Sequence, residues 1–306
     1  MTAVNQRLEH KGTVVDSKND FDVIECEACG FKHIVPIPSC EELGLIYGED
    51  YYRKEYPFYF EHQREDSEWW DNVFLKRYVL FECQLPPHRR RILDIGSGSG
   101  LFLKLGMQRG WETLGVEPSP PAAEQARQWG LSIVNEFLTE GNVHQLGQFD
   151  VVHMHEVLEH IPHPEEMLNL ALRLLRPGGI LCVVVPNDYN PLQQVLRTAC
   201  GYQPWWLAPP HHINYFSVTS LAGLIGKTGF EVIHKTATFP MELFLLMGDN
   251  YVGNDQLGRA MHGKRKKLEL SLWRAGYDAL WEKVYDGLAD VGVGREVVMY
   301  ARRPQA

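Results

Sequence analysis

The chain lacks any apolar run long enough to cross a bilayer. Its longest apolar runs lie near residues 181–185 and 243–247, whereas a membrane-spanning helix needs about 20 predominantly apolar residues. Residues 1–7 also contain no apolar core of the kind that a secretory leader carries. We therefore expect no membrane insertion and no signal peptide.

An excess of positive charge is also absent. The 30 Lys and Arg residues are outnumbered by 39 Asp and Glu residues, which gives a formal net charge of -9 at pH 7. Binding to a phosphodiester backbone needs a clustered basic face. The one basic run, residues 264–267, falls in a helical pattern among polar residues, where a solvated face is expected. A nucleic-acid partner is therefore not expected.

Cysteine is sparse, and its six positions are irregularly spaced. Disulfide frameworks are typical of short secreted chains with regular cysteine spacing, so this pattern predicts reduced thiols and a cytoplasmic location. Internal repeats and low-complexity segments are absent as well. A length of 306 residues suits one α/β domain with additions and is enough to bury a core.

A glycine-rich turn follows a short apolar run near residue 92. Residues 92–100 read as a buried strand with the acid Asp94 and then three alternating glycines, which open into the amphipathic run 101–108. Glycines at such a turn let the backbone approach a ligand closely, because a Cβ atom would collide with it. A second apolar strand, residues 113–116, ends in Glu117, which is placed to bind a ribose diol. The pattern predicts a nucleoside-binding strand–helix–strand unit.

The glycine spacing indicates which nucleoside is bound. A dinucleotide fingerprint has glycine at its sixth position, where a helix N-terminus accepts a pyrophosphate. Here Leu101 occupies that position, and Asp94 precedes the first glycine. A carboxylate would repel a pyrophosphate but suits the ammonium group of a methionine moiety. The pattern therefore favours S-adenosylmethionine over NAD.

The region from about residue 91 to residue 186 resembles the core of class I S-adenosylmethionine-dependent methyltransferases. Further motifs at 149–152, 156–160 and 175–179 carry the resemblance. It implies a Rossmann-like α/β fold with a seven-stranded, mostly parallel sheet, helices on both faces and an antiparallel last strand. It also implies that the first acid and the glycines hold the methionine part of the cofactor and that the second acid binds the ribose. The expected cofactor contacts are Asp94, Gly96, Ser97, Gly98, Gly100, Glu117, Pro118 and Glu156.

Composition divides the chain into three parts. Residues 1–57 form an N-terminal appendage that contains a Cys-x-x-Cys knuckle, and residues 58–88 form a helical lid or linker. Residues 89–306 form the predicted S-adenosylmethionine-binding domain, with a helical insertion at about residues 240–292 before the last strand. Insertions at the carboxyl ends of strands usually cover the ligand crevice of an open α/β sheet.

Methyl transfer to a hydroxyl or carbon also needs a base, and histidine is the usual one near neutral pH. His160 follows the fourth predicted strand, and His211 and His212 precede Tyr215 on a loop that is expected to fold over the same face. We predict that His212 is the base, with His160 as the alternative, and that Tyr215 orients the imidazole or the acceptor. The other possibility is that His211 and His212 only cap the helix that starts near Ser217.

Two subfamilies resemble parts of the chain. Residues 156–160 are similar to a segment of ubiquinone-type O-methyltransferases, which implies either ligands for a divalent metal ion or only the floor of the pocket. The cysteine knuckle, a tyrosine-rich stretch and the loop 211–217 resemble sugar C-methyltransferases, in which a Glu-His-x-x-Tyr-Tyr-Ser loop supplies the base. His212 matches that base, but His211 replaces the acid and Phe216 replaces a tyrosine. Because the acid would help to remove a carbon-bound proton, these departures favour methylation of oxygen, with carbon as the alternative.

The expected function is therefore methyl transfer from S-adenosylmethionine to a small polar acceptor, a hydroxyl of a carbohydrate or of a nucleotide-linked sugar. One alternative is O-methylation of a quinone-like or other aromatic small molecule. Another is a cofactor-binding protein without catalysis. Aromatic residues at 51–52 and 69–70 are predicted to close over the site, or else to pack the appendage against the core.

The knuckle itself offers half of a zinc site. Cys26 and Cys29 are followed by Gly30 and place two thiolates at a turn. His33 and Cys40 would complete a Cys₃His set with irregular spacing. The alternative is a vestigial knuckle that binds no metal.

Overall fold

A central sheet organises the computed structural model of this chain, which describes residues 10–46 and 58–305. Within these residues, seven strands pair in the order β10-β11-β8-β7-β4-β5-β6. They are β4 (Arg91–Ile95), β5 (Glu112–Val116), β6 (Ser132–Val134), β7 (Phe149–His155), β8 (Leu175–Pro186), β10 (Glu231–Ala237) and β11 (Glu296–Arg302). All neighbours run parallel except β11, which is antiparallel to both β8 and β10. The Rossmann-like α/β fold expected from the sequence is confirmed.

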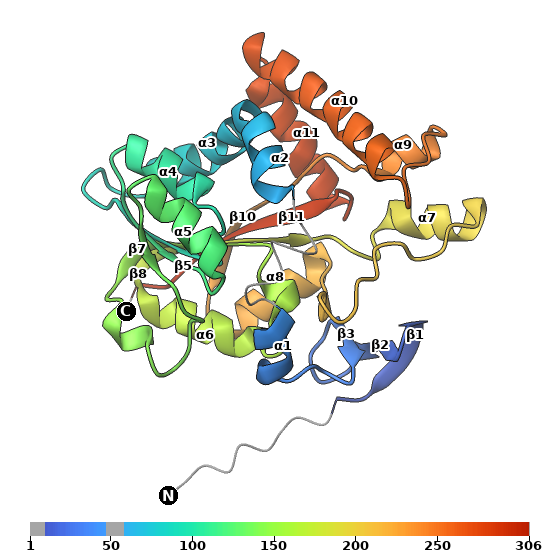
Figure 1. The fold of residues 1–306 in the computed structure, drawn as a ribbon, viewed down its shortest axis with the longest axis horizontal. Coiled ribbons are helices and arrows are strands. Elements are labelled where there is room, and N and C mark those ends of the chain that lie inside the picture. Colours follow the sequence, from blue (N-terminus) through green and yellow to red (C-terminus); the bar gives the residue numbers. More distant parts are fainter. Residues whose placement is uncertain (1–9, 47–57, 306) are drawn as a thin grey trace, which may run out of the picture.

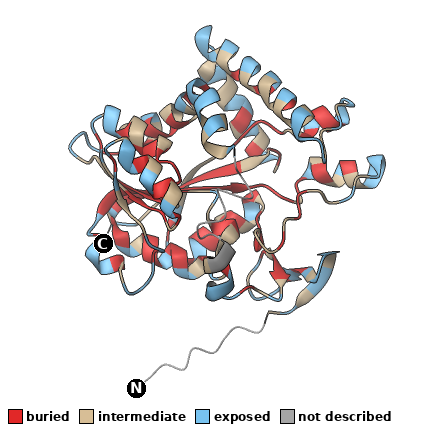
Figure 2. Ribbon diagram, viewed as in Figure 1, coloured by how far each residue is buried: buried red, intermediate tan, exposed pale blue. Residues whose placement is uncertain are grey.

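Helices cover both faces of this sheet, because its central strands are apolar at consecutive positions (Figure 1). Successive side chains of a strand point to opposite faces. Leu93 packs with α6 (Pro164–Leu174) and α8 (Val218–Lys227), whereas Ile92 packs with α3 (Ser67–Gln84) and α4 (Leu101–Gln108). Helix α5 (Pro120–Gln128) lies on the α4 side. Figure 2 shows buried residues concentrated in the strands between these two layers.

A second, four-stranded sheet joins the N-terminal segment to a distant part of the chain. Its order is β1-β2-β3-β9, with strands β1 (Gly12–Lys18), β2 (Phe21–Cys26), β3 (Lys32–Val35) and β9 (Asn214–Tyr215). In the β3–β9 pairing, His33 lies opposite Asn214. Residues of this sheet, helix α1 (Cys40–Ile46) and the segment 205–207 form a core of their own around Ile34 and Tyr215.

The predicted insertion before the last strand is helical. It contains α9 (Glu242–Leu246), α10 (Asp255–Arg274) and α11 (Asp278–Asp290), and it has a small core around Phe244, Met261 and Tyr285. Helix α11 packs on β10, and α10 packs on α11 and α3. Helices α2 (Tyr59–Glu65) and α7 (Pro191–Cys200) and the short 3-10 helices η2 (Val143–Gln145) and η3 (Leu158–His160) complete the described elements. Among the described residues, no helix is long and apolar enough to cross a membrane.

Candidate functional site

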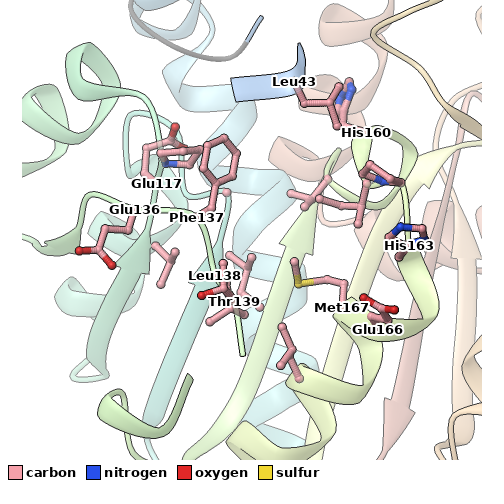
Figure 3. A pocket seen from close by; sticks show the side chains of 18 of the residues that line it. Leu43, Glu117, Glu136, Phe137, Leu138, Thr139, His160, His163, Glu166 and Met167 are labelled. Atoms are coloured by element: carbon pink, nitrogen blue, oxygen red, sulfur yellow. The ribbon is translucent and has the colours of Figure 1, made fainter. Parts of the chain in front are cut away.

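A cavity of about 760 Å³ opens at the carboxyl ends of β4, β5 and β7. The chain runs outward from β4 to β5 and β6 and then returns to β7 on the other side of β4. Ligands of open α/β sheets bind at such a reversal of strand order. In Figure 3, Glu117, Glu136 and Phe137 face His160, His163 and Met167 across this cavity. Its volume lies within the range of about 300–1,000 Å³ that is typical of small-molecule sites.

The glycine turn after β4 forms one wall at Gly96. Gly96 has a φ of +70°, and a Cβ atom there would lie 2.5 Å from Cγ2 of Val157. Its N–H donates to the carbonyl oxygen of Val116 at 2.8 Å, which ties the turn to the end of β5. Only glycine satisfies both the backbone angle and the contact. Ser97, Gly98 and Gly100 continue the turn but do not line the cavity.

Glu117 lies at the end of β5, buried and against the cavity. Its two carboxylate oxygens accept hydrogen bonds from the N–H groups of Gly98 and Ser119, both at 2.8 Å. Burial raises the pKa of Glu117 to about 7, although these hydrogen bonds act in the opposite direction. The adjacent Pro118 also lines the cavity. A carboxylate that is fixed in this way can accept further hydrogen bonds from a diol, because each oxygen has a second lone pair.

Asp94 lies near the carboxyl end of β4 and does not line the cavity. Its Oδ1 lies 2.7 Å from Nδ1 of the buried His153, whose Nε2 is 2.9 Å from the guanidinium of Arg77. Since Arg77 can only donate, the proton of His153 is on Nδ1 and is donated to Asp94. Burial raises the pKa of Asp94 to about 8, whereas this hydrogen bond favours the carboxylate. The direct contact of Asp94 with the cofactor stays a prediction.

Glu156 follows β7 with a left-handed backbone, at a φ of 54°. Such a conformation is uncommon outside glycine and clusters at functional sites. The side chain lines the cavity and is solvent-accessible there. Partial desolvation by the surrounding protein and then the carboxylate of Glu296 raise the pKa of Glu156. His155, Glu156 and Glu296 lie close enough together to share a metal ion.

His160 is the one predicted base that lines the cavity. Its Nδ1 donates to the carbonyl oxygen of His211 at 2.8 Å, so Nε2 is the acceptor nitrogen of the ring. Nε2 lies 3.8 Å from a carboxylate oxygen of the buried Glu159. Burial lowers the pKa of His160 to about 4. Burial and then the charge of Glu156 raise the pKa of Glu159. Perturbed titratable groups in a cleft are characteristic of functional sites.

His212 lies beside His160 and not on the cavity wall. The two rings meet edge to face with centroids 5.0 Å apart, and burial lowers the pKa of His212 to about 3. Glu159, His160 and His212 form a set that could ligate a divalent ion. Tyr215 is buried in the second sheet, where its hydroxyl accepts a hydrogen bond from the N–H of Ala208 at 3.3 Å.

Several cavity residues have no counterpart in the predicted site. They come from the loop after β6 and from the start of α6, and they include Phe137, Leu138, Thr139, His163 and Met167. The loop after β6 could have been suspected, because it follows a strand at the same carboxyl edge. Its residue types alone form no motif. Glu159 was part of the recognised segment, but its burial is a property of the fold.

The tryptophan pair that was expected to close over the site packs elsewhere. Trp69 is buried against α10, where its ring lies 4.9 Å from that of His262. Trp70 stacks on Phe74 at 5.1 Å. Neither tryptophan lines the cavity. The partner segment 51–52 lies outside the described residues.

The predicted zinc ligands Cys26, Cys29 and His33 lie together, and His10 joins them. The side chain of Cys40 lies outside the described part of the structure.

Comparisons with known proteins show the family of the chain. Residues 60–235 match a family model described as a methyltransferase domain. The chain is 29% identical to the ubiquinone biosynthesis O-methyltransferase of Caulobacter sp. (strain K31), over 48% of this chain and 69% of that protein. It is 27% identical to the protein of that name from Ruegeria pomeroyi, over 55% of this chain and 79% of that one.

Solved structures show the same fold at low sequence identity. Phosphoethanolamine N-methyltransferase 2 of Haemonchus contortus, in complex with S-adenosyl-L-methionine, is similar with a TM-score of 0.52 and 15% identity, over 95% of this chain and 71% of that one. A SAM-dependent methyltransferase of Archaeoglobus fulgidus is similar with a TM-score of 0.50 and 17% identity, over 80% of this chain and 99% of that one.

Proposed function

Because the chain belongs to the methyltransferase-domain family and is an S-adenosylmethionine-dependent methyltransferase, we propose that it methylates a hydroxyl oxygen of a quinone-like or other aromatic small molecule. The named activity of the curated relatives, O-methylation in ubiquinone biosynthesis, supports this acceptor class. The comparisons give no support to the carbohydrate acceptor that the sequence suggested.

The lining of the cavity is the observation that carries the proposal. Its wall beside His160 is built mostly from apolar side chains, which are Leu43, Val157, Ile161, Pro162, Met167 and Leu170. An aromatic ring gains free energy when it leaves water for such a surface, at about 25 cal/mol per Å² of apolar area. A sugar would need hydrogen-bond partners for most of its hydroxyl groups, and on this side they would have to come from Glu156, His160, His163, Glu166 and Asn169.

The other half of the cavity fits S-adenosylmethionine. Gly96 lets the backbone approach a ligand without a Cβ atom in the way, and Glu117 presents a buried carboxylate where a ribose diol would lie. When bound, this cofactor supplies an electrophilic methyl group on a sulfonium centre. Asp94 also joins β4 to β7 through its hydrogen bond with His153.

His160 would take the proton from the acceptor hydroxyl at Nε2. The hydrogen bond from Nδ1 to the carbonyl of His211 holds the ring in the tautomer that this role needs. Nε2 also lies 3.8 Å from a carboxyl oxygen of the buried Glu159, whose raised pKa favours its neutral, protonated form. His212 would then position His160 by packing against it. This assignment moves the base from His212, the residue favoured by the loop motif, to His160.

An acceptor panel tests the acceptor class. Catechols and hydroquinones with apolar side chains would be compared with nucleotide sugars, each with S-adenosylmethionine, and products would be identified by mass and by the position of the new methyl group. We expect methyl ethers of the phenols. Methylation confined to sugars, or to carbon or nitrogen, would contradict the proposal.

Glu117→Ala tests the cofactor half of the site. We expect the affinity for S-adenosylmethionine to fall by about 1.5–3 kcal/mol, because charge-assisted hydrogen bonds are lost. Titration calorimetry measures the change. Glu136→Ala is the matched control, since Glu136 is also an acid on the cavity wall but has no assigned role. Equal losses in the two variants would argue against a specific contact.

A further inference from the structure

A cluster of two thiols and two imidazoles lies in the small N-terminal sheet, outside the cavity. We propose that His10, Cys26, Cys29 and His33 bind one zinc ion. One ligand atom from each of the four residues lies within 4.8 Å of all the others. Two cysteines and two histidines form one of the common structural zinc sets.

Three distances within the cluster are close to the edges of a zinc tetrahedron. Nδ1 of His10 lies 3.4 Å from the sulfur of Cys29, 3.8 Å from the sulfur of Cys26 and 3.1 Å from Nε2 of His33. With Zn–S bonds of about 2.3 Å and Zn–N bonds of about 2.0–2.1 Å, a tetrahedron has edges of about 3.3–3.8 Å. The side chains therefore already converge on a common centre.

Backbone hydrogen bonds bring the four donors together. In the knuckle after β2, the N–H of Gly30 donates to the carbonyl oxygen of Cys26 at 3.0 Å, and Gly30 has a φ of +75°. The N–H of Glu27 donates to the carbonyl of Lys11 at 3.0 Å. Because His10 precedes Lys11, this hydrogen bond places His10 beside the knuckle. His33 projects from β3 toward the same point.

The ring of His33 has the orientation expected of a metal ligand. Its Nδ1 donates to the carbonyl oxygen of Ile34 at 2.9 Å, so Nε2 carries the lone pair and faces the cluster. Zinc-bound histidines are usually held by such a hydrogen bond from the other ring nitrogen. Cys26 and His33 are almost completely buried, with 2% and 1% of their surfaces exposed. Buried donors of this kind need a partner, and a zinc ion would satisfy all four at once.

A metal ion here would stabilise more than the appendage. The small sheet has a limited apolar core, and domains of this size often depend on a metal for stability. Its β3 strand pairs with β9, and the N–H of Ile34 donates to the carbonyl of Ile213 at 2.9 Å. Phe31, next to the knuckle, packs on Phe216 with ring centroids 5.0 Å apart. The zinc site would thereby fix the strand that follows His211 and His212.

Metal content of variants tests the site. The full chain would be purified without an affinity tag or chelator, and its zinc would be measured by plasma mass spectrometry. We expect about one zinc per chain, lost in His10→Ala and in Cys29→Ser. Cys40→Ser and Cys83→Ser are the matched controls and should keep the metal. Less than about a tenth of an equivalent in the unaltered chain would overturn the proposal, as would full retention in either ligand variant.

A second measurement covers the case in which a ligand variant does not fold. The unaltered protein would be treated with a thiol-alkylating reagent before and after addition of a strong zinc chelator, and the labelled cysteines would be mapped by mass spectrometry. We expect Cys26 and Cys29 to react much faster after chelation, whereas the exposed Cys83 and Cys200 should react equally in both samples. Unchanged labelling of Cys26 and Cys29 would contradict a zinc site.

Discussion

His160 shows how the setting of a single residue decides its chemical role. Burial keeps its imidazole neutral at physiological pH, and the carbonyl of His211 holds the proton on Nδ1. His212 has an even lower pKa, from burial and then from the neighbouring His160, but it lies behind the cavity wall. The loop motif favoured His212, because the sequence does not show which of the two rings reaches the cavity.

His160→Ala should slow methyl transfer by about 10²–10⁴-fold, the usual contribution of a general base. Binding of S-adenosylmethionine, measured by calorimetry, should be unchanged. Because the pKa of His160 is lowered to about 4, kcat/KM should lose this contribution only as the pH falls toward about 4, and not near 6.5.

His212→Ala serves as the comparison and should have the smaller effect, since it acts through the position of His160. A larger effect of His212→Ala would restore His212 as the base. Loss of activity with a chelator and its recovery with a divalent ion would instead assign Glu159, His160 and His212 to metal binding.

Gly96 illustrates a requirement that is both conformational and steric. Gly96→Ala adds a Cβ atom 2.5 Å from Val157 at a φ of +70°, so the turn must move and the affinity for S-adenosylmethionine should fall at least tenfold. Gly130→Ala is the matched control, since its φ is +79° but nothing lies within 4 Å of the added atom. It should only reduce stability, by about 1–2 kcal/mol. Equal cofactor affinities of the two variants, measured by calorimetry, would rule out the steric explanation.

At the scale of elements, short strands and loops connect the parts that the sequence separated. β9 has only two residues, yet the side chain of Asn214 donates to the carbonyls of Leu158 and Ile161 at 2.8 and 2.7 Å. It thus holds η3, which ends in His160, against the small sheet. Neither the length nor the composition of β9 predicts a strand, because it forms only through its pairing with β3.

The buried acid Asp66 helps to join the insertion to α3. Asp66, which precedes α3, contacts Arg259, His262 and Lys266 of α10. Although burial opposes ionisation, hydrogen bonds from these three residues hold the pKa of Asp66 well below its usual range.

Asp66→Asn should lower the free energy of unfolding by about 3 kcal/mol, because the cations lose their shared partner. Amide exchange in α10 should accelerate. Glu68→Gln, which breaks an exposed pair with Arg274 between the same helices, should lower it by no more than about 1 kcal/mol. Chemical denaturation compares the two variants, and equal losses would mean that Asp66 does not join the elements as described.

At the scale of the whole molecule, sequence patterns predicted the features that depend on residues close together in the sequence. The parallel core follows from apolar strands and from glycine turns such as the one at Gly96, and the antiparallel β11 followed from the family resemblance. Two features could not be predicted, namely that Phe137 lines the cavity and that His10 lies beside the cysteine knuckle. In both places, residues distant in sequence meet only after folding. Asp94 was placed correctly at the end of β4, but its pairing with His153 depends on the register between β4 and β7.

Buried neutral histidines should also make the stability of the whole molecule sensitive to acid. Burial lowers the pKa of His212 to about 3, whereas an unfolded chain has a histidine pKa of about 6.5. Between these values the unfolded state binds the additional proton, so the stability that His212 contributes is complete above about pH 6.5 and is lost as the pH falls toward 3.

His212→Gln removes this titration. When the pH falls from 7 to 5, the unfolding free energy of the variant should therefore increase relative to that of the unaltered protein by on the order of 1–2 kcal/mol, compared with their difference at pH 7. The difference isolates His212 from buried acids such as Asp94, Glu117 and Asp188, whose raised pKa values favour the folded state as the pH falls. Chemical denaturation at the two pH values measures this difference.

His144→Gln is the control, because the side chain of His144 meets water in both the folded and the unfolded chain. This variant should leave the pH dependence unchanged. An equal pH dependence of the His212→Gln variant and the unaltered protein would show that His212 is protonated to the same extent in the folded and unfolded states.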